Sequence, residues 1–523
     1  MKYLRAVLCL LFSLLLLLSG CGKKETGGEY VIKDDSLAQA APSFRHERVF
    51  YEIFVGSFSD SDGDGTGDLR GIINRLDYLN DGDPASGKSL GVEGLWLTPI
   101  FSSPSYHKYD VTDYYEIDPV FGNMDDLKEL INLCHERDML IILDLPINHT
   151  ARMNEWYGNF VAAHRQGDTE NEYYNFYCWY DGDTSSAPAG RSYTQVSGTN
   201  HYVECNFSGD MPELDFDQPA VREAVYEIAK YYIELGVDGF RFDAAKYVYF
   251  GDNPNSLAFW KEYLGRLREL DPDLYTVAEV WDGDSVTDLY SKVTNCFDFT
   301  VSQAGGLISE TAQKGDANRY VSYVEKYLDT VKAKRTDATI IPFIANHDMD
   351  RAAGYLSSVS GYIQMAANLY ILGPGSPFIY YGEEIGIKGS RGGANTDANR
   401  RLAMLWGDGD AVSDPVGSTY PESARLQVPV IEQIKDETSL YTYYKRVIAA
   451  RRANPEIAQG DYKAVNVPGQ KAAGFTSTYN GSSVTVLHNP SGSSVTIDLA
   501  SIGVSANEIR AVLGAEDATL ENG

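Results

Sequence analysis

Cysteine is scarce in this chain of 523 residues, which contains six of them. No two are spaced as C-x-x-C, so the sequence gives no sign of a zinc ion bound by cysteine pairs. Two cysteines lie near the N-terminus and four lie further along, at Cys134, Cys178, Cys205 and Cys296. In an exported protein, Cys178 and Cys205 either form a disulfide or stay as free thiols.

Basic residues are few relative to acidic ones: 44 Lys and Arg stand against 74 Asp and Glu, and the formal charge is −30. A chain this negative repels a phosphate backbone, which argues against nucleic acid as a partner. The charge suits a soluble protein with a neutral substrate. Hydrophobic residues make up 43% and charged residues 23%, as in ordinary globular proteins with large cores.

The apolar run Ala6–Leu18 follows Lys2 and Arg5. It is shorter than the roughly 20 residues that a transmembrane helix needs, and it has the length of a signal-peptide core. Its end, Leu18-Ser19-Gly20-Cys21, resembles the cleavage box of bacterial lipoproteins. The resemblance implies a signal peptide over residues 1–20 and lipid attached to Cys21. The alternative is an ordinary secretory signal with an incidental cysteine.

Residues 21–42 are rich in Gly, Lys and Glu and show no apolar periodicity, which predicts a flexible tether. We therefore expect an exported protein that is lipid-anchored to the bacterial cell membrane and faces outward. The sequence leaves open which membrane leaflet holds the lipid.

Strand-like and helix-like segments alternate over about 400 residues after Ser43. Eight strands in such an alternation predict a closed parallel (β/α)8 TIM barrel. A doubly wound open sheet is the alternative, but no Gly-rich phosphate loop follows the first strand. The expected strands are Val49–Phe58, Val92–Phe101, Leu140–Asn148, Val237–Asp243, Leu274–Trp281, Cys296–Val301, Thr339–Asn346 and Pro377–Tyr381.

Two segments depart from the alternation. Residues 150–211, after the third strand, are rich in Tyr, Gly and Asn and predict an inserted domain, so the barrel is assigned to residues 43–149 and 212–453. Residues 454–523 contain short alternating runs and predict a C-terminal antiparallel β-sandwich domain. Its expected strands are Ala472–Thr478, Val484–His488 and Ser494–Leu499.

The stretch Gly236–Tyr247 reads GVDGFRFDAAKY. Arg241 and Asp243 are two residues apart on an apolar strand, so their side chains share one face. A buried charge is costly unless it is paired. Either the two form a structural ion pair, or Arg241 keeps Asp243 ionised as a nucleophile.

Other strands end in similar residue types. The third strand contains Asp144 and ends in Asn148 and His149, the fifth carries Glu279 near its end, and the seventh ends in Asn346, His347 and Asp348. The chemistry of a TIM barrel lies at the C-terminal ends of its strands. Four strands therefore bring carboxylates and imidazoles to one rim, which favours a catalytic site over isolated structural residues.

Five segments resemble the signature motifs of the α-amylase family of glycoside hydrolases: DLPINHT, GFRFDAAK, AEVW, FIANHD and MPELDF. The resemblance extends over the inserted and C-terminal domains. It implies that Asp243 is the nucleophile, Glu279 the general acid/base and Asp348 the transition-state stabiliser. Burial and the charge of Asp243 should raise the pKa of Glu279 so that it holds a proton near neutral pH.

The resemblance also implies a set of substrate-binding residues. Tyr109 should stack on the sugar whose bond is cut. Asp110 either bonds that sugar's non-reducing end, as in exo-acting relatives, or holds a Lys or Arg of the loop. His149 and His347 should bond sugar hydroxyls, with Arg241 beside Asp243, and Lys246 should hold sugars beyond the cut.

A loop after the first strand carries alternating carboxylates and glycines. Such a loop can wrap Ca2+ in oxygen ligands, here the side chains of its four aspartates and the carbonyl of Thr66. The alternative is an acidic turn. The loop resembles that of oligo-1,6-glucosidases. A second calcium, held by Asn148 in many α-amylases, is in doubt because Tyr247 stands at a histidine position. The predicted ligands are Asp60, Asp62, Asp64, Thr66 and Asp68.

The resemblance therefore predicts a retaining hydrolase that cuts internal α-1,4 bonds of starch and maltooligosaccharides. Ala244, where α-1,6-acting relatives tend to carry Val, favours α-1,4 bonds. The calcium-type loop and Asp110 are instead typical of exo-acting enzymes. A 4-α-glucanotransferase or α-glucosidase is the alternative, and a non-catalytic glucan-binding lipoprotein is a third.

Overall fold

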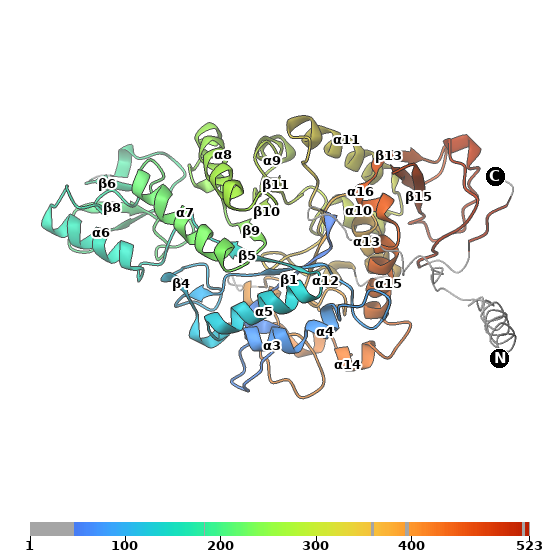
Figure 1. Cartoon of the computed structure of the whole chain (residues 1–523), viewed down its shortest axis with the longest axis horizontal. Helices are drawn as coiled ribbons and strands as arrows, with labels where there is room; N and C mark the ends of the chain where they lie inside the picture. Colours follow the sequence, from blue (N-terminus) through green and yellow to red (C-terminus); the bar gives the residue numbers. More distant parts are fainter. Residues whose placement is uncertain (1–46, 183, 357–359, 393–396, 515–517, 522–523) are drawn as a thin grey trace, which may run out of the picture.

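The computed structural model describes residues 47–182, 184–356, 360–392, 397–514 and 518–521. The predicted signal peptide, Cys21 and the tether lie outside the described residues. Figure 1 shows the barrel in the middle of an elongated molecule, with the insert at one end and the C-terminal sheet at the other. None of the helices in these ranges combines the length and the apolar character that a membrane crossing requires.

A parallel sheet forms the centre of the molecule, in the strand order β11-β10-β9-β5-β2-β1-β12. Parallel bridges from Phe297 to Ile341 and from Phe343 to Phe378 join its two edge strands through a short eighth segment. All eight predicted strands are therefore found, and the (β/α)8 prediction is confirmed. The strands are β1 (Phe50–Ile53), β2 (Gly94–Leu97), β5 (Leu140–Leu145), β9 (Gly239–Phe242), β10 (Tyr275–Ala278), β11 (Asn295–Cys296) and β12 (Phe378–Tyr380).

The interior of the barrel is filled by large apolar side chains that form a core of their own, including Phe50, Trp96, Tyr275 and Phe378. Gly94 makes room for this filling, because a Cβ there would lie 2.5 Å from the ring of Phe50. Side chains alternate along a strand, so the residue two positions after an inward apolar residue also points inward. The later inward positions of these strands are polar, and they carry the candidate site.

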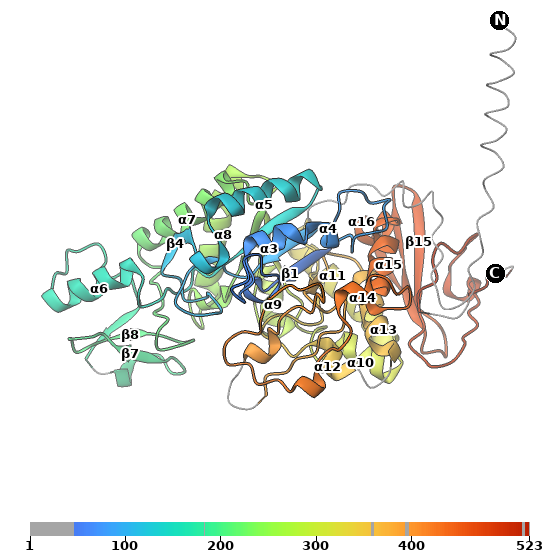
Figure 2. The ribbon, with the colours of Figure 1, turned by 90° about the horizontal axis from the view of Figure 1, so that it is seen from below.

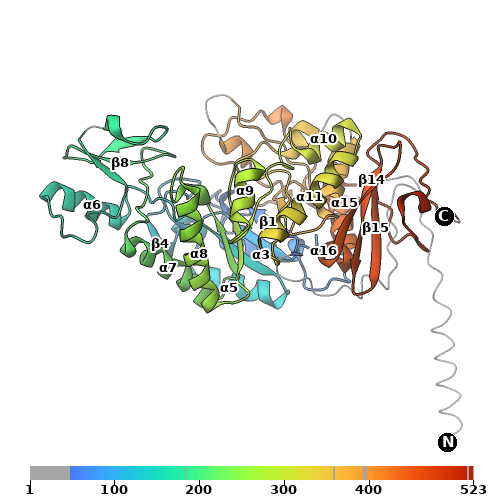
Figure 3. The same cartoon turned by 90° about the horizontal axis from the view of Figure 1, so that it is seen from above.

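Helices surround the sheet, as Figure 3 shows from above. Apolar side chains of these helices and of the strands are buried together in one large core. The helix-like segments between the predicted strands include α3 (Leu69–Asn74), α4 (Leu76–Leu79), α5 (Met124–Glu136), α7 (Pro219–Glu234), α8 (Asn253–Leu270) and α13 (Ser360–Ile371). The remaining α-helices of this part are α9 (Asp284–Tyr290), α10 (Leu307–Lys314), α11 (Asn318–Lys334), α12 (Ala352–Leu356), α14 (Val430–Gln433) and α15 (Leu440–Arg452).

The insert between β5 and β9 contains α6 (Glu155–Gln166) and an antiparallel sheet of β6 (Trp179–Asp181), β8 (His201–Glu204) and β7 (Tyr193–Gln195). A hairpin of β3 (Phe101–Ser102) and β4 (Asp113–Ile117) precedes it in the chain. Cys178 and Cys205 are free thiols. The N–H of Glu204 bonds to the carbonyl of Cys178, so Cys205 is one residue out of register and faces the other side of the sheet.

The C-terminal part is antiparallel, as expected, and Figure 2 shows it at the end opposite the insert. It consists of α16 (Pro455–Gln459), β13 (Asp461–Asn466), β14 (Ala473–Tyr479) and β15 (Ser482–His488). The described residues form one three-stranded sheet here, with α11 and α16 against it in place of a second sheet. The strand predicted at Ser494–Leu499 is wrong, because this segment leaves its apolar side chains only half-buried and pairs with no strand.

Candidate active site

A buried guanidinium lies at the centre of the polar rim. Nη1 of Arg241, on β9, donates to Asp144 at 2.8 Å and to Asp243 at 2.6 Å. Nη2 of the same side chain lies 3.1 Å from Oε2 of Glu279. Three carboxylates thus share one positive charge away from water. A buried cluster with excess negative charge favours a proton on one of its carboxyl groups.

The chain turns sharply after β9, and this turn fixes Glu279. Ala244 has a positive φ of 48°, a conformation that costs a non-glycine residue about 1 kcal/mol or more. In this conformation the N–H of Ala244 donates to Oε2 of Glu279 at 3.0 Å, and the N–H of Ala245 donates to its carbonyl at 3.1 Å. The strained turn therefore places the nucleophile candidate and the acid candidate side by side.

The ionisation of Asp243 and Glu279 follows from this environment. Burial raises the pKa of Asp243 to about 6, while Arg241 acts to lower it. Burial also raises the pKa of Glu279 to about 7; Asp243 and Asp348 add to the rise, and Arg241 opposes it. Asp243 therefore ionises before Glu279, so one group of the pair can attack while the other holds a proton.

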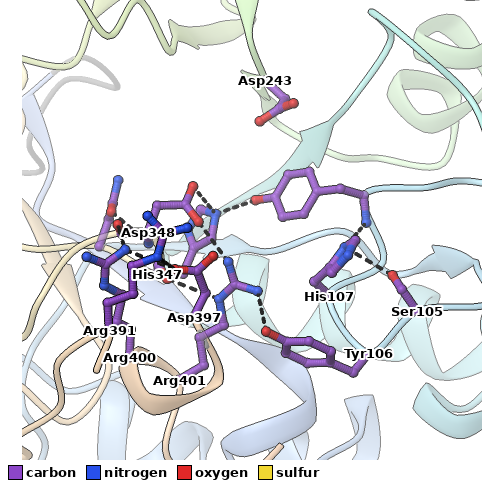
Figure 4. A network of polar contacts seen from close by, with 12 residues as sticks. Ser105, Tyr106, His107, Asp243, His347, Asp348, Arg391, Asp397, Arg400 and Arg401 are labelled. Atoms are coloured by element: carbon purple, nitrogen blue, oxygen red, sulfur yellow. Dashed lines mark hydrogen bonds and ion pairs between the residues drawn. The ribbon is translucent and has the colours of Figure 1, made fainter. Parts of the chain in front are cut away.

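Asp348 lies between two cationic side chains, as Figure 4 shows. Its Oδ2 is 3.2 Å from Nε2 of His347, and its Oδ1 is 2.7 Å from Nη2 of Arg401. Burial disfavours the carboxylate, but His347 and Arg401 overcome this effect and lower the pKa of Asp348 well below its ordinary value. Asp348 is therefore a fixed negative charge.

Tyr109 joins two sides of the site. Its hydroxyl donates to Oδ2 of Asp144 at 2.8 Å and lies 2.6 Å from Nε2 of His347. The rings of Tyr109 and His347 stack, with centroids 5.5 Å apart and an angle of 10° between their planes. A hydrogen-bonded ring is held rigidly, as a surface for stacking a sugar needs to be.

A family model described as the catalytic domain of alpha amylase matches residues 52–460. The chain belongs to the α-amylase family. Alpha-amylase 3 from Dictyoglomus thermophilum is 35% identical over 447 residues, which cover 84% of each chain. The solved structure of Eubacterium rectale Amy13B matches with a TM-score of 0.81 at 32% identity, over 92% of this chain and 93% of that one.

A 4-alpha-glucanotransferase from Thermotoga maritima is 30% identical over 355 residues, which cover 67% of this chain and 74% of that protein. One of these relatives is thus named an alpha-amylase and another a 4-alpha-glucanotransferase. Family membership alone therefore does not choose between the two reactions.

Three other residues were predicted to bind substrate: Asp110, Lys246 and His149. Asp110 accepts hydrogen bonds from Ser103, at 2.8 Å, and from Ser105. Among the described residues, the ion-pair contact of Asp110 is with His107, whose Nδ1 lies 3.8 Å from its Oδ1, and not with a Lys or Arg of the loop. Nζ of Lys246 donates to the carbonyl of Trp281 at 2.8 Å. His149 is buried, and burial lowers its pKa to about 4, so it is neutral.

Two residues of the site, Glu52 and Arg401, could not be assigned a role before the structure was known. Glu52, on β1, accepts from Nδ1 of His347 at 2.6 Å, and Arg401 donates to Asp348 and to the hydroxyl of Tyr106. The inward position of Glu52 could have been predicted, because it lies two residues after the inward-facing Phe50. The position of Arg401 could not, because Arg401 comes from a loop after β12 that has no repeating pattern.

The acidic loop after β1 brings together three of its predicted ligands. Carboxylate oxygens of Asp60, Asp62 and Asp68 lie within 4.8 Å of one another. Asp64 is outside this group, and its carboxylate accepts the N–H of Thr66 at 2.7 Å. All three clustered donors are hard oxygens, which is the ligand type that Ca2+ prefers. The residues therefore fit a divalent cation, with Asp68 also capping α3 through the N–H of Gly71.

The second calcium position of the α-amylase family has a different arrangement here. Nδ2 of Asn148 donates to Glu213, and burial raises the pKa of Glu213 to about 8. Tyr247 packs against Phe207, with ring centroids 4.8 Å apart. The amide of Asn148 thus has a protein partner in this structure.

Proposed function

We propose that this protein is a retaining glycoside hydrolase that cuts internal α-1,4-glucosidic bonds of starch and maltooligosaccharides. The observation that carries the proposal is the guanidinium of Arg241, which contacts both Asp243 and Glu279. A retaining mechanism needs two carboxyl groups close together on opposite sides of the scissile bond, in opposite protonation states.

In the first step, Oδ of Asp243 attacks the anomeric carbon while Glu279 gives its proton to the leaving glycosidic oxygen. This forms a covalent glycosyl ester and releases the shortened glucan. In the second step, Glu279 removes a proton from water, which attacks the anomeric carbon and frees Asp243. The fixed charge of Asp348 and the N–H groups and hydroxyls around it bind the sugar, and Tyr109 supports its ring.

A 4-α-glucanotransferase is the second candidate, because the site has an aromatic surface where an acceptor sugar can lie. Trp281 is 40% exposed, follows Glu279 by two residues and stacks on Phe299 at 5.0 Å. Lys246 holds its carbonyl. An acceptor that binds there competes with water for the glycosyl ester, so the same residues serve hydrolysis and transfer.

The experiment is a time course of starch and maltoheptaose digestion with products resolved by chain length. Early short oligosaccharides from starch support endo-hydrolysis; chains longer than the supplied maltoheptaose identify a transferase, and glucose alone identifies an α-glucosidase. Asp243→Asn should lower turnover by about 10⁴-fold or more while glucan binding persists. The control Asp77→Asn changes a surface carboxylate that contacts Arg137 and should leave turnover intact.

If Asp243→Asn retained turnover, Asp243 would not be the nucleophile. If the wild type bound glucan without turnover, the protein would be the glucan-binding lipoprotein considered as the third possibility. We also propose that Cys21 carries a lipid that anchors the exported enzyme to the bacterial membrane, where the negative surface charge does not hinder a neutral glucan. The lipoprotein-type box at Leu18–Cys21 supports this proposal.

A further inference from the structure

Glu52 is a carboxylate inside the barrel. It lies on β1, it is 1% exposed, and its strand neighbours in register are Trp96 and Tyr380. A buried carboxylate costs several kcal/mol unless it is paired and hydrogen-bonded. His347 offsets the cost of burying Glu52. Oε1 of Glu52 accepts hydrogen bonds from Nδ1 of His347 at 2.6 Å and from the backbone N–H of His347 at 3.3 Å.

The hydrogen bonds on the other side of the ring determine how many protons His347 carries. The single proton of the Tyr109 hydroxyl is donated to Asp144 at 2.8 Å. The oxygen of Tyr109, 2.6 Å from Nε2 of His347, must therefore accept, and Nε2 must carry a proton. An ionised Glu52 can only accept, so Nδ1, 2.6 Å from its Oε1, carries a proton as well. The ring with both protons is an imidazolium.

The charges around the ring favour the same state. Burial disfavours the imidazolium, but the carboxylates of Asp348 and Glu52 outweigh it and raise the pKa of His347 to about 10. Burial raises the pKa of Glu52, and the charge of His347 opposes that rise. The titratable and charged groups that face His347 from the surrounding elements are Glu52, His107, Tyr109, Asp144, Asp348 and Arg401. Arg241 lies behind Asp144, to which it donates.

We propose that Glu52 is a positioning residue, which holds His347 as a fixed imidazolium whose Nε2–H donates to Tyr109, with Asp348 beside it as the counter-charge. Without the carboxylate, Nδ1 loses its acceptor, and the ring can become neutral and change its tautomer. Asp348 then loses part of its counter-charge, and Tyr109 loses the donor that orients its hydroxyl. The kinetic consequence rests on the proposed function, but the protonation of His347 does not.

The direct test is the NMR titration of the wild-type protein labelled with 13C at histidine Cε1. The chain has eight histidines, and the signal that His347→Gln removes is that of His347. It should stay at the imidazolium position from pH 6 to about 9, in line with the raised pKa. In Glu52→Gln, which keeps the shape and removes the charge, the midpoint should fall by about one pH unit or more.

Glu52→Asp keeps the charge on a shorter side chain and should restore part of the wild-type titration. Glu384→Gln is the matched control, because Glu384 is buried to the same degree as Glu52. Glu384 accepts a hydrogen bond at 2.8 Å from the hydroxyl of Tyr51, the residue before Glu52 on β1, whose side chain points away from the barrel interior. It should leave the His347 signal unchanged. In the folded Glu52→Gln protein, kcat/KM for maltoheptaose should fall about tenfold or more, with partial rescue in Glu52→Asp.

A neutral His347 at pH 7 in the wild type overturns the proposal, and this result does not depend on whether any variant folds. An unchanged titration in Glu52→Gln, or an equal change in Glu384→Gln, overturns it as well. If the titration behaves as expected but no glucan is cut, the proposed function fails and the role of Glu52 stands.

Discussion

Oε2 of Glu279 lies 3.1 Å from Nη2 of Arg241, the side chain whose Nη1 binds Asp243. The sequence assigned Arg241 to the nucleophile, whereas the structure places it between the nucleophile candidate and the acid candidate. Its planar fork can serve two carboxylates at once, which a lysine ammonium cannot do.

Arg241→Lys should therefore keep the buried positive charge and lose the shared geometry. We expect kcat to fall about 10²-fold or more with only a small change in thermal stability. The measurement is steady-state kinetics on maltoheptaose beside a thermal melt. Arg266→Lys, a change in a surface pair with Glu223, is the control and should be silent. Wild-type kcat in Arg241→Lys would show that charge alone is sufficient.

The pH dependence follows from the two raised pKa values. Activity needs Asp243 ionised, so it rises as pH increases through about 6, and it needs Glu279 protonated, so it falls as pH increases through about 7. We expect a bell-shaped profile of kcat/KM with its maximum between these values, and the two limbs belong to the coupled pair. A profile that stays flat from pH 5 to 9 would contradict this assignment of acid and nucleophile.

Much of the fold could be predicted because the barrel strands are short apolar runs separated by amphipathic helices. Arg241 and Asp243 could be placed on one face because side chains alternate along a strand with a period of two. The same period places Glu52 on the inward face of Phe50. The segment Ser494–Leu499 also alternates, but its apolar side chains stay only half-buried and it forms no strand.

The parts that escaped prediction are those set by contacts between distant loops. Arg401 lies 53 residues after Asp348 in the chain, and its place beside that carboxylate depends on the path of an irregular loop. The register of the insert sheet also decides whether Cys178 and Cys205 can form a disulfide. Cys178 lies opposite Glu204, so the side chain of the next residue, Cys205, faces the other side of the sheet. No spacing of residues in the sequence contains this information.

Cys21→Ser should release the protein from the membrane. Lipid on the thiol and amino group of a mature N-terminal cysteine is the anchor that the box at Leu18–Cys21 predicts, and two or more acyl chains are needed for stable membrane attachment. We expect the wild type in the membrane fraction and the variant in the soluble or secreted fraction, by immunoblot. Cys134→Ser, which changes a buried cysteine of the barrel, is the control. A variant that stays in the membrane would argue against the lipid anchor.

The acidic loop after β1 should bind calcium and stabilise the barrel. Oxygens of Asp60, Asp62 and Asp68 crowd together, so an ion between them would relieve the repulsion of three carboxylates. A ligand present at 100 times its Kd adds about 2.7 kcal/mol to the free energy of unfolding. We therefore expect Ca2+ to raise the Tm of the wild type and chelator to lower it.

Asp62→Asn is the sharpest variant for this site, because Asp62 is exposed and, unlike Asp68, caps no helix. It should abolish the response of Tm to Ca2+ and to chelator while changing the Tm measured in chelator by little. Asp125→Asn, at an exposed position of α5 beside Lys128, is the control and should keep the full response. If chelator leaves the wild-type Tm unchanged, or if Asp62→Asn responds as the wild type does, the loop is an acidic turn held by its own hydrogen bonds, such as those that Asp60 accepts from the N–H groups of Gly63 and Gly65.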